Sequence, residues 1–348
     1  MQTTPRQLGY SFPAEWEAHE ATWLTWPQNE ATWTGPRLKA VQMVFLEFIR
    51  AVSQGEKVHL MVQDAAMQAD VAEALDKIGT ALSQVHFHQW PTNDAWIRDY
   101  GPAFLINRQA EAPKLLVNWT YNAWGGKYPP FEQDNQIPTR VAQCLGVPSF
   151  DGPAIMEGGS VEFNGQGTLL TTEGCLLHPN RNPQLKKPEI ERILEEYYGV
   201  SQVLWLGEGI VGDDTDGHID DITRFVSADT VLTVVEQNAS DVNYAPLQAN
   251  LERLQKMRLP NHQPLNVLTL PMPSPIYIEG ERMPASYANF YIANAAVIVP
   301  VFKTSQDEAA LKIVETCFPG RQIIGLDARD IIWGLGSFHC LSQQEPAI

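Results

Sequence analysis

The feature that most constrains the fold of this chain is a weak internal repeat, in which pairs of short apolar strands recur about every 60 residues. One pair is predicted at residues 157–172, where an Asn-Gly dipeptide forms the turn. Residues 218–235 and 286–301 predict further pairs, and residues 98–107 begin another. A polar or chemically active residue opens each unit, at intervals of 58, 61, 68 and 54 positions: Asp99, Glu157, His218, Ser286 and Cys340.

Amphipathic helices are predicted between these strand pairs. Apolar residues recur with helical spacing in residues 38–52, 190–198 and 311–318. Pro188 and Gly199 flank the second of these helices, as expected at helix ends. Short apolar strands follow the helices: VHLMV, VHFHQ, VLWL, NVLTL and QIIGL. The repeated unit is therefore predicted to be ββαβ.

The last predicted strand, at residues 339–344, has no sequential partner, and residues 21–27 form another unpaired strand near the N-terminus. Pairing these two strands would close five units into a ring without exposed sheet edges. We therefore predict a single α/β domain over residues 1–348, in which the opening residues converge on one central site. The alternative is an ordinary mixed α/β sandwich in which the spacing is fortuitous.

The composition indicates a globular protein with a strongly acidic surface. The chain has 44% hydrophobic residues, a formal net charge of −17 and an isoelectric point near 4.8. Such a surface repels nucleic acid and anionic membranes and favours cationic ligands. The sequence shows no signal peptide, no stretch able to span a bilayer, and no CxxC pair among its four cysteines. A cytoplasmic location with reduced thiols is therefore expected.

The acidic stretch GDDTDGHIDD, at residues 212–221, is the first candidate for a functional site. An EF-hand calcium loop aligned on it would require carboxylates at Gly212 and Thr223, so this interpretation fails, and a looser Ca²⁺ or Mg²⁺ site is the alternative that stays open. A solvated loop, whose aspartates cap and turn the chain, accounts for Asp213 and Asp214.

A solvated loop does not account for His218, which opens an alternating apolar strand. Side chains two residues apart in a strand lie on the same face, so Asp220 is expected beside His218. A carboxylate beside an imidazole orients the ring and stabilises its charged form.

The cysteines differ in their surroundings. Cys340 lies in GLGSFHCLSQQEP, where glycines allow a ligand to approach the backbone closely, although a buried core thiol is the usual role of such a residue. Cys144 and Cys317 fall in helical patterns and are predicted to be core residues. Cys175 lacks an obvious activating set.

Two further motifs carry charged residues before tight turns. NDAWIRDYGP contains Trp96, Arg98 and Asp99, and a structural ion pair between Arg98 and Asp99 is the alternative to a functional role. MEGGS places Glu157 before two glycines, which again permits close approach of a ligand.

In this order, the motifs WIRDYGP, EGGS, TLLTTEGCLLHPNRNP, DDTDGHIDD, SYANFYIANAAVIVP and SFHCLSQQEP resemble those of the agmatine deiminases. FPAEWEAHEATWLTWP and NWTYNAWGGKYPP resemble the same family, so the likeness extends from about residue 10 to 345. These enzymes belong to the guanidine-modifying (pentein) superfamily. The resemblance implies a five-bladed, pseudo-fivefold α/β propeller of ββαβ units, with no cofactor and no metal.

The resemblance also implies the roles of individual residues. Cys340 corresponds to the nucleophile and His218 to the general acid and base. The guanidinium-binding carboxylates correspond to Asp99 and Asp220. Glu157 matches the remaining acidic position, Trp96 matches an active-site aromatic residue, and Asp214 and Asp216 are candidates for attracting the far amine. The family motif GGGNIHC is here GLGSFHC, which leaves the details of substrate binding open.

The implied reaction is hydrolysis of agmatine to N-carbamoylputrescine and ammonia through a covalent thiouronium intermediate, a step of putrescine synthesis. The implied partner is thus a small cationic guanidino compound, and a homo-oligomer is compatible with the sequence. Deimination of arginine or peptidylarginine is the nearest alternative, for which Arg98 could bind the α-carboxylate. A cysteine protease using Cys340, His218 and Asp220, and a propeller that only binds partners, are two further alternatives.

Overall fold

The predicted ββαβ unit recurs five times in the fold, which is described here from a computed structural model for residues 3–348. Those residues form five sheets of three or four strands and one two-stranded hairpin, β13–β14 (Tyr277–Ile278 and Glu281–Arg282). In each of the five sheets, one antiparallel strand pair is followed by a parallel strand.

Four of these sheets have three strands each, in the order antiparallel pair and then parallel partner. They are β4–β5–β6 (Ala103–Ile106, Lys114–Thr120, Ser149–Ile155), β7–β8–β9 (Val161–Phe163, Thr168–Thr172, Gln202–Leu206), β10–β11–β12 (Thr223–Phe225, Thr230–Val235, Asn266–Pro271) and β15–β16–β17 (Tyr291–Ile292, Ala296–Val301, Gln322–Asp327).

The fifth sheet joins the two ends of the chain, as the unpaired strands predict. β18 (Ser342–Pro346) runs antiparallel to β1 (His19–Thr25), which continues in parallel to β2 (Lys57–Val62) and β3 (Val85–Gln89). Because β1 lies between two partners, its backbone is paired on both edges and six of its seven residues are buried.

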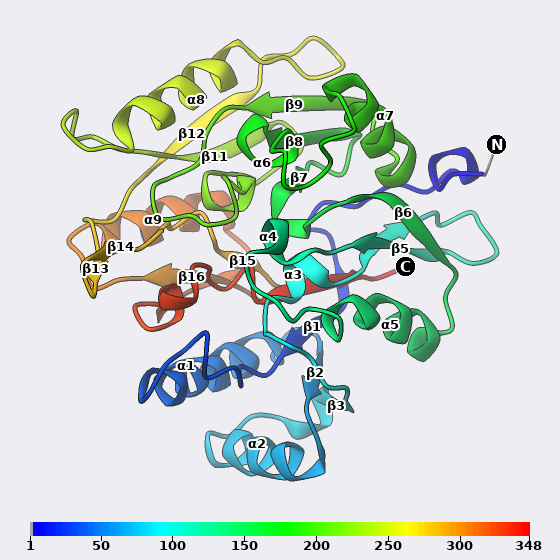
Figure 1. Cartoon of the computed structure of the whole chain (residues 1–348), viewed down its shortest axis with the longest axis vertical. Coiled ribbons are helices and arrows are strands. Elements are labelled where there is room, and N and C mark those ends of the chain that lie inside the picture. The colour runs from blue at the N-terminus through cyan, green and yellow to red at the C-terminus, as the bar shows by residue number, and fades with distance from the viewer. Residues whose placement is uncertain (1–2) are drawn as a thin grey trace.

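The longer helices connect the parallel strands and most of them lie toward the outside of the molecule, whereas the short helices α3 and α4 lie near its middle (Figure 1). The α-helices of the described residues are α1 (Arg37–Val52), α2 (Ala65–Lys77), α3 (Ile97–Tyr100), α4 (Ala123–Gly126), α5 (Ile137–Leu145), α6 (Glu173–Leu176), α7 (Lys187–Tyr198), α8 (Tyr244–Lys256) and α9 (Asp307–Cys317).

The end of α7 shows how local sequence fixes these helices. Pro188 lies in the first turn, where its missing N–H costs no hydrogen bond, and Gly199 ends the helix with φ of 68°. Ile190, Leu194 and Tyr198 recur at helical spacing and are buried against the sheet side. Burial of each such side chain contributes about 1.5–3 kcal/mol, so packing and not helix propensity holds α7 in place.

One predicted strand begins later than expected. Residues 219–221 form a 3₁₀ turn, and β10 starts only at Thr223. His218 and Asp220 therefore do not share a strand face, and the alternation that placed them together is wrong. The turn itself brings their side chains near one another, with Nδ1 of His218 at 3.9 Å from Asp220.

Candidate active site

Four of the five opening residues lie close together, each on a short turn that precedes a sheet. Asp99 belongs to α3, Glu157 and His218 each precede a 3₁₀ turn, and Cys340 precedes β18. All four side chains are buried. Ser286 is also buried, and its hydroxyl donates to the carbonyl oxygen of Asp221, the neighbour of Asp220, at 2.7 Å.

His218 lies at the centre of this group, between three carboxylates. Its Nδ1 is 3.8 Å from Asp99 and 3.9 Å from Asp220, and its Nε2 is 3.6 Å from Glu157. Burial alone would lower the pKa of His218, but Asp99 and then Cys175 and Glu157 outweigh it and raise the pKa well above its ordinary value. The ring is therefore suited to holding a proton and donating it.

Asp99 is fixed in orientation by two donors. The backbone N–H of Gly159 and the indole N–H of Trp124 each donate to its carboxylate, both at 2.9 Å. Burial raises the pKa of Asp99 to about 6; His218 opposes this shift, and the neighbouring carboxylates add to it. A cation that reached Asp99 would relieve this repulsion, so the free site is poised to bind positive charge.

Gly159 permits this arrangement because it has no side chain. A Cβ there would lie 2.6 Å from Nδ1 of His218, 2.9 Å from Asp99 and 3.0 Å from Asp220. These distances are shorter than van der Waals contact. The second glycine of MEGGS therefore makes room for the three side chains themselves.

Cys340 is held between an amide and a carboxylate. The side-chain amide of Asn289 donates to its sulfur at 3.0 Å, and the thiol lies 3.4 Å from Asp220. Burial raises the pKa of Cys340 well above its ordinary value, and the charges of Asp220, Asp221 and Asp99 raise it further. The thiol is thus protonated until positive charge enters the site. Asn289 lies in the SYANFYI motif and was not predicted to be a site residue.

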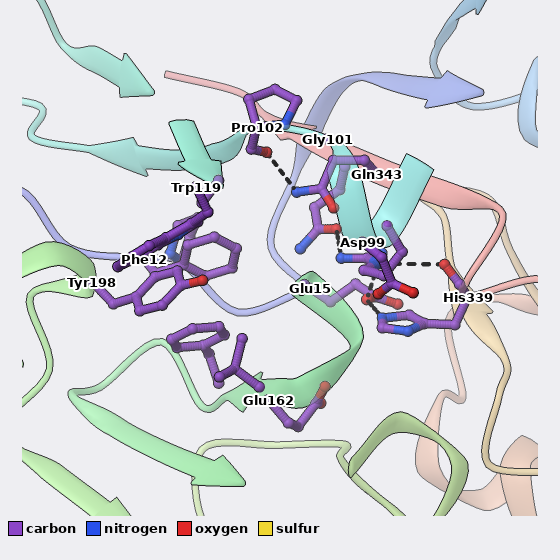
Figure 2. A pocket seen from close by; sticks show the side chains of 17 residues that line it. Phe12, Glu15, Asp99, Gly101, Pro102, Trp119, Glu162, Tyr198, His339 and Gln343 are labelled. Carbon is purple, nitrogen blue, oxygen red and sulfur yellow. Dashed lines mark hydrogen bonds and ion pairs between the residues drawn. The ribbon is translucent and has the colours of Figure 1, made fainter. Parts of the chain in front are cut away.

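Asp220 is itself supported from behind by a second imidazole. His339 approaches Asp220 through Nδ1 at 2.7 Å and Glu15 through Nε2 at 2.8 Å, and Figure 2 shows its ring beside Glu15. Glu15 also receives Arg98 at 3.4 Å and Arg224 at 3.0 Å. The alternative interpretation, an ion pair between Arg98 and Asp99, does not hold, because Arg98 pairs with Glu15.

Cys340, Asp99 and Trp96 line a cavity of about 530 Å³. Gly334 and Gly336 pack against the indole ring of Trp96, where a Cβ would lie 2.6 and 2.7 Å from ring atoms. These glycines therefore make space for an aromatic side chain, which the sequence did not predict. The cavity is large enough for a small linear substrate.

A second cavity lies on the other side of Asp99 and is much smaller, about 20 Å³. In Figure 2 the rings of Phe12, Trp119 and Tyr198 gather on one side of it, away from Glu15 and His339. Its volume is close to that of one water molecule, so it does not admit a substrate.

The other aspartates of the acidic stretch have different environments. Asp214 lines the large cavity and contacts Lys127 at 3.2 Å. Asp216 is bound by Arg181 at 2.5 Å and by Lys127 at 2.9 Å. Asp213 accepts the backbone N–H of His218 at 3.1 Å. The capping role predicted for Asp213 is correct, but it anchors the residue at the centre of the site.

The remaining cysteines differ from the sequence interpretation. Cys144 is exposed, so the prediction that it is a core residue is wrong, whereas Cys317 is half-buried and packs against the main apolar core. Cys175 is fully buried, and its thiol donates to Glu157 at 3.9 Å. One ligand atom from each of Glu157, Cys175 and His218 lies within 4.8 Å of the other two. Cys175 therefore has the charged neighbours that its sequence context did not reveal.

Comparison with known proteins gives a consistent family. Residues 11–346 match the Porphyromonas-type peptidyl-arginine deiminase family. A curated relative from Legionella pneumophila (strain Paris) is 39% identical over 347 residues, which cover 99% of this chain and 98% of the relative.

Within residues 3–348, no helix combines the length and the apolar character needed to cross a membrane.

Two solved structures are similar over nearly the whole chain. The agmatine deiminase of Enterococcus faecalis, described as catalysing its reaction, has a TM-score of 0.91 at 34% identity and covers 99% of this chain and 98% of its own. A cysteine-to-serine variant of the C. jejuni agmatine deiminase, with substrate bound, has a TM-score of 0.87 at 34% identity and covers 97% and 96%. The mixed α/β fold described above is thus the fold of these enzymes.

Proposed function

The chain belongs to the Porphyromonas-type peptidyl-arginine deiminase family, and from this premise we propose that it hydrolyses agmatine to N-carbamoylputrescine and ammonia. The observation that carries the proposal is the arrangement of Cys340 beside Asp220, with Asp99 lining the same cavity. Two buried carboxylates next to a thiol are suited to a guanidinium, whose N–H groups bind carboxylates in bidentate fashion.

The first chemical step uses the charge of the substrate. When the guanidinium binds Asp99 and Asp220, its positive charge offsets the carboxylates that hold the Cys340 thiol protonated. The thiol then loses its proton to solvent, the thiolate attacks the guanidinium carbon, and His218 donates a proton to the departing nitrogen, which leaves as ammonia.

The second step consumes water. His218, now neutral, removes a proton from a water molecule, which attacks the carbon of the thiouronium intermediate. The bond from carbon to sulfur breaks, the proton of the new hydroxyl group passes to the departing sulfur of Cys340, and the ureido product is released with the thiol restored. Glu157 lies 3.6 Å from Nε2 of His218, where its charge stabilises the protonated ring in both steps.

The charges of the large cavity favour agmatine over arginine. Lys127 is the single cation among the described residues that line it, and it is bound to Asp214 and Asp216. Arg98, the sequence candidate for a carboxylate partner, contacts Glu15 and does not line the cavity. A substrate that carries an amine at its far end is therefore preferred. The amine would lie nearer to the carboxylate of Asp214, and Asp216 would lie behind Asp214.

The arrangement of the whole chain forms part of the same proposal. Five ββαβ units closed by β1 and β18 support a five-bladed propeller that is a single catalytic domain over residues 1–348. A role in putrescine synthesis follows from the proposed reaction, and a cytoplasmic location and assembly into a homo-oligomer are compatible with it.

Ammonia release from agmatine, arginine and a blocked arginine peptide tests the proposed function. We expect kcat/KM for agmatine to exceed the other values by at least about 100-fold, because burying the α-carboxylate of arginine in the cavity costs several kcal/mol and the blocked peptide lacks the charged amine at the far end. Faster turnover of arginine than of agmatine would identify arginine as the substrate.

The nucleophile is tested by matched variants. Cys340→Ser should abolish turnover and formation of the covalent intermediate, which intact-protein mass spectrometry of rapidly quenched reactions detects. Cys175→Ser should still form the adduct, because Cys175 does not line the large cavity. An adduct in Cys340→Ser and none in Cys175→Ser would assign the nucleophile to Cys175.

A further inference from the structure

Behind the thiol proposed to react, Glu157, Cys175 and His218 form a cluster that the deimination mechanism uses only in part. The Oε2 atom of Glu157 lies 3.6 Å from Nε2 of His218 and 3.9 Å from the sulfur of Cys175. The other oxygen of Glu157 is bound by Arg181 at 2.7 Å, which fixes the orientation of the carboxylate. One oxygen, one nitrogen and one sulfur are thus directed at the same small volume.

The imidazole in this cluster is incompletely satisfied. His218 is fully buried, and neither of its ring nitrogens has a hydrogen-bond partner among residues 3–348. Most buried polar side-chain atoms have such a partner, so an orphaned nitrogen aimed at a thiol and a carboxylate indicates a place for a further ligand.

The spacing of the three atoms fits a small tetrahedral cation. A zinc ion binds nitrogen, oxygen and sulfur at about 2.0–2.3 Å, which separates its ligand atoms by roughly 3.3–3.8 Å. The separations of 3.6 and 3.9 Å agree with this range within small side-chain movements, and every pair lies within 4.8 Å. A thiolate and an imidazole select zinc-like ions over magnesium or calcium, which prefer oxygen ligands.

We propose that Glu157, Cys175 and His218 form an inhibitory site for a thiophilic divalent cation such as Zn²⁺, separate from the Cys340 thiol. The ion displaces the protons of the thiol and the imidazole, which pass to solvent, and its fourth position is open to water. With Nε2 bound to the ion, His218 no longer exchanges protons with the substrate. The enzyme is therefore switched off without modification of Cys340.

Cobalt(II) is the probe for this site, because thiolate coordination to Co²⁺ gives a charge-transfer band in the near ultraviolet. The Cys340→Ser variant is titrated first, so that this thiol cannot contribute. We expect it to bind about one equivalent of Co²⁺ and to show the thiolate band. Excess Zn²⁺ should then displace the Co²⁺ and abolish the band. A Co²⁺ complex that lacks the band, or no binding, would overturn the proposal.

Double variants identify the thiol. Adding Cys175→Ser to Cys340→Ser should remove the band and weaken binding by at least about 100-fold, whereas adding Cys317→Ser, a half-buried thiol on α9, should change neither. If Cys175→Ser fails to fold, Glu157→Gln in the same background should weaken binding while keeping the band. Unchanged affinity in both variants would refute the site.

Inhibition kinetics test the consequence for turnover. Zn²⁺ should inhibit the wild-type protein, and Cys175→Ala should require at least about tenfold more Zn²⁺ for half-inhibition. Equal inhibition of both proteins would place the ion on Cys340 instead and would contradict the proposed separation of the two thiols.

Discussion

At the scale of single residues, the main feature is the excess of negative charge around one imidazole and one thiol. Asp99, Asp220 and Glu157 surround His218 within 3.6–3.9 Å, and the same charges hold Cys340 protonated. In the free protein these carboxylates repel one another, and a bound cation relieves the repulsion. The same group of carboxylates therefore determines both the affinity for a guanidinium and the reactivity of the thiol.

Charge removal at either clamping carboxylate should impair catalysis strongly. Asp99→Asn and Asp220→Asn keep the side-chain size but break a paired, desolvated contact, which typically costs about 2–5 kcal/mol. Steady-state kinetics on agmatine should show kcat/KM lower by roughly 10² to 10³. Asp70→Asn, at an exposed position on α2, is the control and should be unchanged. Similar losses in all three variants would mean that only the overall field matters.

The activity should fall in acid because Asp99 must be ionised to bind a cation. Its pKa is raised to about 6, so its charge is present above this pH and is lost as the pH falls through it. We expect kcat/KM to decrease about tenfold per pH unit below an apparent pKa near 6, which belongs to the coupled cluster as a whole. A flat profile from pH 7.5 to 5, with the fold intact by circular dichroism, would contradict the shift.

At the scale of elements, the site is built from turns that precede strands. The 3₁₀ turns at Gly158–Ser160 and Ile219–Asp221 contact one another and replace the regular strand that the sequence pattern predicted for residues 219–221. A turn can direct two side chains and a backbone N–H at one point, which an extended strand cannot do because its side chains alternate. The catalytic geometry therefore depends on the spacing of these turns.

Gly159→Ala tests this dependence. Its Cβ would come within 2.6–3.0 Å of atoms in His218, Asp99 and Asp220, so these side chains must move. We expect kcat/KM for agmatine to fall by at least about 100-fold, since small displacements of reacting groups have effects of this size. Gly320→Ala is the control, because its Cβ would meet nothing within 4 Å. Full activity of Gly159→Ala would show that the turns tolerate a shift.

At the scale of the whole molecule, the two ends of the chain support each other. β18 pairs with β1, and the indole N–H of Trp23 in β1 donates to Glu345 in β18 at 2.8 Å. Lys114, at the start of β5, also donates to Glu345, so a neighbouring sheet depends on the same strand. Cys340 lies two residues before β18, which links closure of the fold to placement of the thiol.

Removal of residues 342–348 should therefore destabilise the entire chain. Losing five buried strand residues and the cover of β1 costs several kcal/mol, which should lower the midpoint of thermal unfolding by roughly 10 °C or more. Calorimetry should show one transition that moves as a whole. Deletion of Ile348 alone, which is exposed, is the control. A second, unshifted transition would indicate an independent domain and contradict the single-domain proposal.

The sequence alone predicted the strand pairs, several of the helices and the strand that closes the fold. The hairpin around residues 164–165, the helix ending at Gly199 and the pairing of β1 with β18 were all predicted from local patterns, and the structure confirms them. These features follow from interactions within a few residues or from the need to cover an open strand edge. They are visible in the sequence because side-chain periodicity reports directly which face of an element is buried.

Only the tertiary structure decided which side chains meet. Asn289 contacts Cys340 across 51 positions, and His339 contacts Glu15 across 324. Cys175 lies beside Glu157, and Cys144 is exposed although it was predicted to be buried. Both outcomes likewise depend on how neighbouring units are rotated against each other. Periodicity within one element carries no information about that rotation, which is set by packing between sheets. The site is therefore predictable in its residue types and not in its contacts.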